Sequence, residues 1–155
     1  MRVLGVDVGT RRVGLALSDP SATLATPLRA LEVSGPPENS AAAVAREIAA
    51  LMAEGDGLHA VVVGVPRFLD GQPHRQTETV LRFVALLRSK AAVPVELQDE
   101  RLSSWEAESR LAVREKDWRR RKVRLDAAAA AVILQDYLDS GRTPETGDGD
   151  RKTED

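Results

Sequence analysis

Residues 6–19 read VDVGTRRVGLALSD and follow the apolar start MRVLG. The apolar runs at 2–8 and 13–18 are rich in valine and leucine and are separated by a turn containing glycine, so they predict two short strands. Asp7 stands inside the first run, where burial makes an ionised carboxylate costly. An acid in a strand needs a partner, and we therefore interpret Asp7 as a functional residue.

The remainder of the chain alternates between strand-like and helix-like segments. A run of valines at 59–66 that ends in proline predicts a central strand buried on both faces. The other predicted elements are strands at 28–33 and 94–100, a helix over 41–54 with its N-cap at Asn39 or Ser40, a helix over 75–90, a helix opened by a capping box at Ser103, and a last helix from about Val123 to Leu138. This order predicts an α/β fold with a mixed sheet and helices on both faces. We expect one domain over 1–139 and a disordered acidic tail at 140–155.

Composition limits the class of protein. With 155 residues, 43% hydrophobic and 30% charged, the chain has the size and balance of one globular domain. It has no cysteine, and no apolar run approaches the ~18 residues of a membrane span, so we expect a cytoplasmic protein with no membrane partner. The net charge of −2 is unevenly spread, because residues 110–124 hold eight bases and two acids whereas 139–155 hold six acids and three bases. The basic stretch is a candidate surface for a phosphate backbone, although a run of charge is more often a solvated face.

Besides Asp7, two acids fall where packing explains them poorly. Glu100 closes a predicted strand beside Asp99, and Asp126 opens the apolar stretch of the last helix. Each has an ordinary explanation when taken singly, because strand-end acids are commonly exposed and an acid near a helix N-terminus gains about 0.3–1 kcal/mol from the helix dipole. If the sheet brings the three carboxylates together, they repel one another unless cations intervene, and hard oxygen ligands select Mg²⁺ or Mn²⁺. Two such ions are a known device for phosphodiester cleavage.

Several segments resemble the YqgF/RuvX family of RNase H-like resolvases. VDVGTRRVGLALSD is similar to the opening strand and turn of that family, DERLSS at 99–104 to its Asp-Glu-Arg-Leu motif, and KVRLDAAAAAVILQDYL at 122–138 to its final helix with a buried acid. ATPL at 25–28, VVVGVP at 61–66, FLDG at 68–71 and RFVALL at 82–87 also match. The likeness covers residues 1–139 and implies an RNase H-like fold, with a five-stranded mixed sheet in the order 3-2-1-4-5 flanked by helices.

The resemblance also implies roles for individual residues. Asp7, Glu100 and Asp126 would be the catalytic, metal-binding acids, with Asp7 bridging two Mg²⁺ or Mn²⁺ ions. Substrate-binding roles would belong to Thr10, Arg11, Arg12, Arg101 and Ser104. Independently of the resemblance, the basic stretch adds Arg119, Arg120, Arg121 and Lys122 as candidate contacts to the phosphate backbone. The loop PRFLDG at 66–71 departs from the family's Pro-x-Asn-x-x-Gly, which puts a polar contact at that loop in question.

The family implies a metal-dependent nuclease that acts in 5′-end processing of the 16S ribosomal RNA precursor, in resolution of Holliday junctions, or in both. Its partners would be structured RNA and branched or single-stranded DNA. The alanine run at 127–131 itself indicates tight packing of a helix on a sheet, and it also suits a homodimer face. Two other classes stay open. One is a non-catalytic nucleic-acid-binding or ribosome-assembly module. The other is an actin-like ATPase, which has a similar Asp-x-Gly-Thr turn but needs two such domains, whereas this chain supplies one.

Overall fold

The computed structural model describes residues 1–66, 75–100 and 118–141. Its elements are β1 (Arg2–Val8), β2 (Arg12–Ser18), β3 (Ala25–Glu32), α1 (Pro37–Met52), β4 (Leu58–Pro66), α2 (Arg75–Lys90), β5 (Val95–Glu100) and α4 (Trp118–Asp139). The five strands form one sheet in the order β3-β2-β1-β4-β5, which confirms the order implied by the resemblance. β2 is antiparallel to β1 and β3, whereas β4 is parallel to β1 and β5. The predicted helix at Ser103 and the predicted tail at 140–155, apart from its first two residues, lie outside the described residues.

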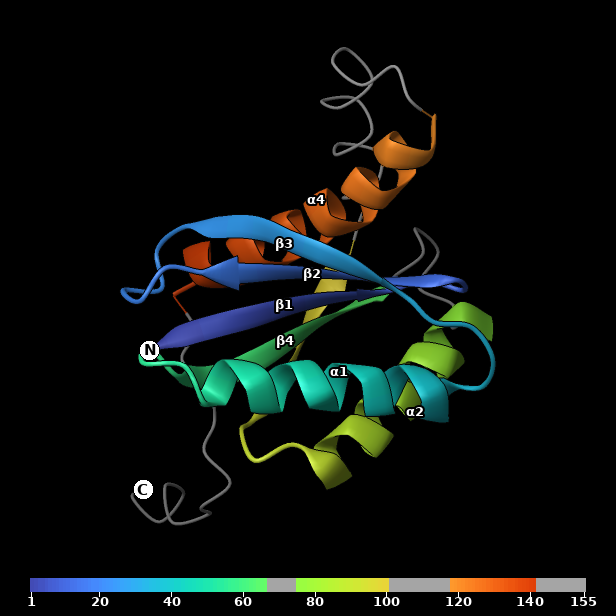
Figure 1. The fold of residues 1–155 in the computed structure, drawn as a ribbon, viewed down its shortest axis with the longest axis horizontal. Helices are drawn as coiled ribbons and strands as arrows, with labels where there is room; N and C mark the ends of the chain where they lie inside the picture. Colours follow the sequence, from blue (N-terminus) through green and yellow to red (C-terminus); the bar gives the residue numbers. More distant parts are fainter. Residues whose placement is uncertain (67–74, 101–117, 142–155) are drawn as a thin grey trace.

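Helices cover both faces of the sheet, as the strand–helix alternation predicted (Figure 1). α1 and α2 lie on one face, and their core with the sheet includes Leu4, Leu15, Val44, Val63 and Phe83. α4 lies on the other face, and its core includes Val3, Ala16, Ala60, Ile133 and Tyr137. No helix in the described ranges is both long enough and apolar enough to cross a membrane.

Glycines let α4 approach the sheet closely. A β-carbon at Gly5 would lie 2.7 Å from the β-carbon of Leu134, and one at Gly14 would overlap the backbone carbonyl of Asp126. Ala127, Ala129 and Ala130 are buried in this contact. The alanine run is therefore used for packing within the chain, as tight helix-on-sheet contact rather than as a free face.

Two helices begin elsewhere than predicted. α1 starts at Pro37 behind Pro36, and no side chain caps it; proline suits the first helical position because its φ is preset and its missing N–H is not needed there. Asn39 was a predicted cap, but its side-chain amide instead donates to the backbone carbonyl of Ser34 at 3.0 Å. α4 starts at Trp118 rather than near Val123, because arginine and lysine are good helix formers and extend the helix through the basic stretch.

The third strand is also longer than predicted, since it begins at Ala25 rather than at 28. The added residues include Pro27, which cannot donate a backbone hydrogen bond. β3 is an edge strand, where proline is tolerated. The pairing of β2 with β3 shifts register between Leu15 and Ala16, opposite this proline.

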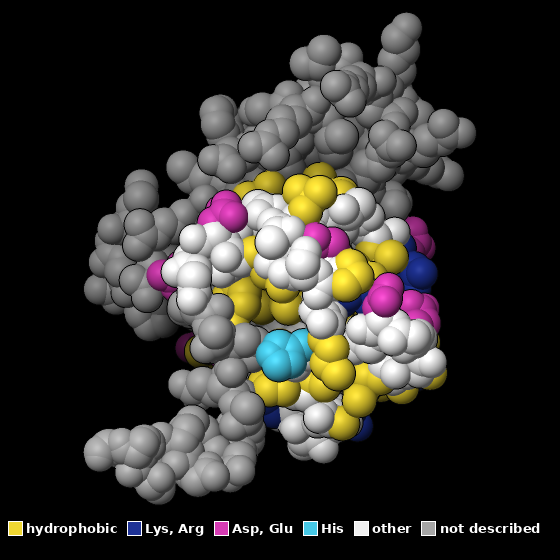
Figure 2. Space-filling view, turned by 90° about the vertical axis from the view of Figure 1, so that its left-hand side faces the viewer, with side chains coloured by type: hydrophobic (Ala, Val, Ile, Leu, Met, Phe, Trp, Pro, Cys, Tyr) yellow, Lys and Arg dark blue, Asp and Glu magenta, His cyan; other side chains and the backbone are white. Residues whose placement is uncertain are grey.

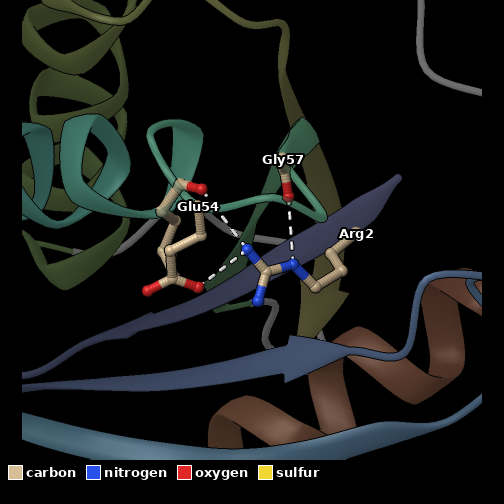
Figure 3. Close-up of polar contacts among 4 residues, drawn as sticks. Arg2, Glu54 and Gly57 are labelled. Atoms are coloured by element: carbon tan, nitrogen blue, oxygen red, sulfur yellow. Dashed lines mark hydrogen bonds and ion pairs between the residues drawn. The ribbon is translucent and has the colours of Figure 1, made fainter.

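A buried arginine secures the start of β1 (Figure 3). Nε of Arg2 donates to the carbonyl of Gly57 at 3.0 Å, and its guanidinium lies 3.0 Å from the carboxylate of Glu54. A further hydrogen bond of 3.3 Å reaches the carbonyl of Leu51. Arg2 thus ties the first strand to the connection between α1 and β4, at the end of β1 away from Asp7.

Candidate active site

The first two predicted acids meet at the carboxyl ends of parallel strands. Asp7 is the penultimate residue of β1 and Glu100 is the last residue of β5. The side chain of Asp7 is hydrogen-bonded to that of Glu100. Carboxyl ends of strands in open α/β sheets are where binding sites commonly form.

A missing side chain on the intervening strand makes this contact feasible. β4 separates β1 from β5 in the sheet, and its Gly64 pairs with Gln98. Oε1 of Glu100 lies 3.2 Å from the position that a β-carbon of Gly64 would occupy. Glu100 therefore reaches toward Asp7 across a glycine. Sequence reasoning did not single out Gly64, although a glycine within the run VVVGVP was the available signal.

The third acid is supplied by the helix. Asp7 pairs with Gly14 across the β1–β2 ladder, and the backbone of Asp126 lies directly over Gly14. The charge of Asp126 acts on Asp7. α4 runs with its N-terminal end toward the carboxyl end of β1 (Figure 1), so the close packing of helix on sheet is what brings this acid to the site.

The environment favours the protonated form of Asp7. Its pKa is raised well above the ordinary value of 3.8, first by burial, then by the negative charges of Glu100 and Asp126, and also by the hydrogen bond with Glu100. A carboxyl group held among two other acids is typical of functional sites, because the folded chain bears an electrostatic cost there.

The charges of Glu100 and Asp126 act on Asp7, but the three carboxylates are not arranged as a set of metal ligands. Among residues 1–66, 75–100 and 118–141, no three acid or histidine side chains already stand in an arrangement that could hold a metal ion. The chemistry of the donor set nevertheless suits a hard divalent cation, since it offers carboxylate oxygens and an excess of negative charge. The three acids therefore suit a divalent cation by the type of their donor atoms and by their charge.

Strand alternation separates Glu100 from its neighbour Asp99. Val95 and Leu97 of β5 pack in the core beneath α1 and α2. Side chains alternate along a strand, so Asp99 is on that same side and Glu100 is on the side of α4. Asp99 is exposed, and Glu100 is the acid of the pair that belongs to the site.

The predicted substrate-binding residues separate into three groups. Thr10 and Arg11 are exposed in the turn after β1, and Arg12 is partly buried at the start of β2. The backbone of Arg119, Arg120, Arg121 and Lys122 lies in the first turns of α4, while their side chains fall outside what the structure describes. Arg101, Ser104 and the loop after Pro66 also lie outside the described residues.

The acid that closes the opening motif has a structural role instead. Asp19 follows β2 and accepts hydrogen bonds from Ser21, Thr23 and Leu24. These bonds, that from Ser21 foremost, hold the pKa of Asp19 well below its usual range. Ser18 accepts a hydrogen bond of 2.8 Å from the backbone of Val3. Both residues belong to the end of the sheet remote from Asp7.

The described surface at the end of the sheet remote from Asp7 is not basic (Figure 2). Figure 2 looks onto the end of the sheet where β1 begins, and the described surface there is largely apolar or neutral, with lysine and arginine at its margins. Met1 and Leu24 are among the exposed hydrophobic residues of the chain. In the part of this face that is described, basic groups do not gather as a phosphate backbone would require.

Comparison with known proteins places these features in a family context. A family model described as "RuvX: Holliday junction resolvase" matches residues 1–140. A relative from Chloroflexus aggregans, named "Putative pre-16S rRNA nuclease", is 42% identical over 142 residues, which are 92% of this chain and 96% of the relative. A relative of the same name from Anaeromyxobacter dehalogenans is 42% identical over 141 residues, 90% of this chain and 97% of its own length.

Solved structures support the fold. Thermus thermophilus RuvC, solved in complex with a Holliday junction substrate, superimposes with a TM-score of 0.52 at 19% identity and covers 91% of this chain and 96% of RuvC. A second structure of T. thermophilus RuvC gives a TM-score of 0.50, again at 19% identity, and covers 90% of this chain and 95% of RuvC. RuvC has an RNase H-like fold, and the mixed sheet in the order 3-2-1-4-5 agrees with it.

Proposed function

Because the chain belongs to the RuvX family, we propose that it is a nuclease that depends on a divalent metal and hydrolyses phosphodiester bonds. The observation that carries this proposal is the acidic site, in which Asp7 is hydrogen-bonded to Glu100 and lies under the charge of Asp126. Acids gathered at the carboxyl ends of β1 and β5 are costly to the fold unless they serve a ligand of opposite charge.

The three carboxylates are the residues that would hold Mg²⁺ or Mn²⁺. When bound, such ions supply an activated water and charge stabilisation at the leaving oxygen. Asp7 interacts with both Glu100 and Asp126. It is therefore the acid that would best serve two ions.

We infer that the substrate is a structured nucleic acid, with the precursor of 16S ribosomal RNA as the first candidate. The names of relatives about 40% identical over nearly the whole chain support that choice. Four-way DNA junctions are the second candidate, supported by the description of the family model. Arg11 and Arg12, in the turn and strand next to Asp7, would contact phosphates near the bond that is cleaved.

The decisive assay measures cleavage of precursor ribosomal RNA, four-way junctions and single strands with Mg²⁺, with Mn²⁺ and in chelator. We expect metal-dependent hydrolysis with a 5′-phosphate product, and we expect Asp126→Asn to lower the rate by about 100-fold or more while nucleic acid still binds. Near-full activity of Asp126→Asn would show that this acid is not a ligand. Binding without cleavage under all metal conditions would identify a non-catalytic module instead.

The basic start of α4 provides a separate test of binding. Replacing Arg119, Arg120, Arg121 and Lys122 with glutamine should weaken nucleic-acid binding across all sequences, because the protein then neutralises fewer phosphates and releases fewer counterions. The slope of log Kd against log salt concentration should fall by about one for each phosphate that is no longer neutralised. Titrations at several salt concentrations measure this slope. An unchanged slope would exclude these four residues from the interface.

A further inference from the structure

Arg12 occupies the same face of the sheet as the acidic site. The β1–β2 ladder pairs Asp7 with Gly14, and Arg12 lies two residues before Gly14 on the same side of β2. Diagonal neighbours of this kind are about 7–8 Å apart, within reach of a long side chain. A guanidinium at this position could therefore reach a phosphate adjacent to one that cations hold at the acidic site.

The ion-pair partner of Arg12 is a surface glutamate on the neighbouring strand. β2 pairs with β3 so that Arg12 stands opposite Glu32, and Nε of Arg12 lies 3.6 Å from Oε2 of Glu32. The side chain of Arg12 is 19% exposed and that of Glu32 is 75% exposed. Glu32 was not singled out from the sequence, where it is one acid among many.

Arg12 and Glu32 attract each other by charge, but Glu32 does not provide a hydrogen bond to Nε of Arg12. A separation of 3.6 Å is too long for a hydrogen bond, and Nε of Arg12 is buried with no hydrogen-bond partner in the described part of the chain. A guanidinium presents its N–H donors in a plane that matches phosphate oxygens. A phosphate would thus supply the hydrogen bond that Nε lacks, and the exposed Glu32 is able to swing away into water.

We propose that Glu32 is the resident counter-ion of Arg12, and that it holds the guanidinium toward β3, on the side of β2 away from Asp7, until a substrate phosphate displaces it. Glu32 is then a positioning residue that also weakens substrate binding, because its attraction to Arg12 must be given up. The inference rests on the proposed function in one respect, namely that the ligand is a nucleic-acid phosphate.

The experiment is a double-mutant cycle on binding, performed in chelator so that no cleavage occurs. Kd for a labelled four-way junction and for a precursor ribosomal RNA fragment is measured for the parent, Glu32→Gln, Arg12→Gln and the double variant. Glu32→Gln should tighten binding about two- to five-fold, the range expected when one exposed ion pair is given up. Arg12→Gln should weaken binding, and in that background Glu32→Gln should bring no gain.

Two control variants separate this effect from general charge. Glu38→Gln removes the same charge from the opposite layer, where Glu38 pairs with Arg82 at 2.6 Å on the α1–α2 side, and it should leave Kd unchanged. Glu32→Asp retains the charge next to Arg12 and should bind like the parent. Thermal melting of each variant reports whether it is folded.

The outcomes are distinct. An equal gain from Glu32→Gln with and without Arg12 would mean that Glu32 acts only by long-range repulsion, and weaker binding by Glu32→Gln would mean that it contacts the substrate; either overturns the proposal. A parent that binds neither nucleic acid overturns it as well. A parent that binds but does not cleave when Mn²⁺ is added contradicts the nuclease function alone, and leaves the binding cycle fully interpretable.

Discussion

Replacing Asp7 with asparagine is expected to abolish most of the nuclease activity and, at the same time, to stabilise the metal-free protein. If Asp7 is a metal ligand, as proposed, its replacement takes several kcal/mol of charge stabilisation from the reaction, which corresponds to about a thousand-fold lower rate. In the absence of metal, asparagine retains the size of aspartate and cannot ionise. It therefore avoids the repulsion that Glu100 and Asp126 exert on Asp7.

The stability effect has a defined dependence on pH. The folded-state pKa of Asp7 is raised above its ordinary value of 3.8, so the favourable contribution of its protonated form is complete below that value and is lost as pH rises through the folded-state pKa. At pH values above the folded-state pKa of Asp7, we expect the free energy of unfolding of Asp7→Asn to exceed that of the parent by about 1–3 kcal/mol. This is the range for relieving an unfavourable buried polar group. Denaturant titrations in chelator, at mildly acidic and mildly alkaline pH, measure the difference.

A neighbouring acid provides the matched control. Asp99 adjoins Glu100 but is exposed on the other side of β5, so Asp99→Asn should leave metal-dependent activity close to that of the parent. Added Mg²⁺ should stabilise the parent more than Asp7→Asn, because the proposed metal site includes Asp7 and is formed only in the folded protein. If Asp7→Asn cleaved at the rate of the parent, the assignment of Asp7 as a metal ligand would be wrong.

The second large effect is expected from Gly14→Ala. A β-carbon at Gly14 would overlap the carbonyl oxygen of Asp126 and lie 3.2 Å from the backbone nitrogen of Ala127. Backbone atoms of a packed helix cannot rotate away, so α4 must move off the sheet at this point. Overpacking of this kind costs about 1–3 kcal/mol and occasionally more, and it displaces Asp126 from Asp7. We expect a decrease in stability near the top of that range together with a strong decrease in activity, measured by denaturant titration and by the cleavage assay.

Gly55→Ala is the control for this substitution. A β-carbon at Gly55 would meet nothing within 4 Å, so the same chemical change in the connection between α1 and β4 should alter the melting temperature and the activity little. Comparison of the two variants separates a general effect of removing glycine from the specific contact with α4. If Gly14→Ala had the stability and cleavage rate of the parent, the close packing of α4 against β2 would not be required for either.

Much of the fold follows from local patterns in the chain. The valine run that forms β4 has apolar side chains for both faces of a sheet, and the helical spacing over 75–90 matches α2 at both ends. These elements were predictable because burial on two faces, or along one stripe, leaves a periodic signature. The start of α1 was not, because Pro36 and Pro37 begin the helix without the side-chain cap that Asn39 or Ser40 was expected to supply.

The candidate site was predictable in its members but not in its geometry. Asp7 was identifiable because an acid within a buried strand is costly. Glu100 and Asp126 were candidates because packing explains them poorly, and the likeness to the family implied that the three acids share a role. The choice of Glu100 over Asp99 depends on which face each residue of β5 takes. The reach of Glu100 past Gly64 and the pairing of Arg12 with Glu32 depend on strand order and register, which join residues far apart in the chain.

The amino-acid order alone therefore determined the types of the described elements, the opening hairpin and Asp7 as the candidate central acid, since these arise from the spacing of apolar and polar residues over short stretches. Folding in three dimensions settled how the acids meet, because contacts across β4 and between α4 and the sheet depend on side-chain size at Gly14 and Gly64. Those glycines carry no chemistry of their own, and their importance becomes evident from what lies against them.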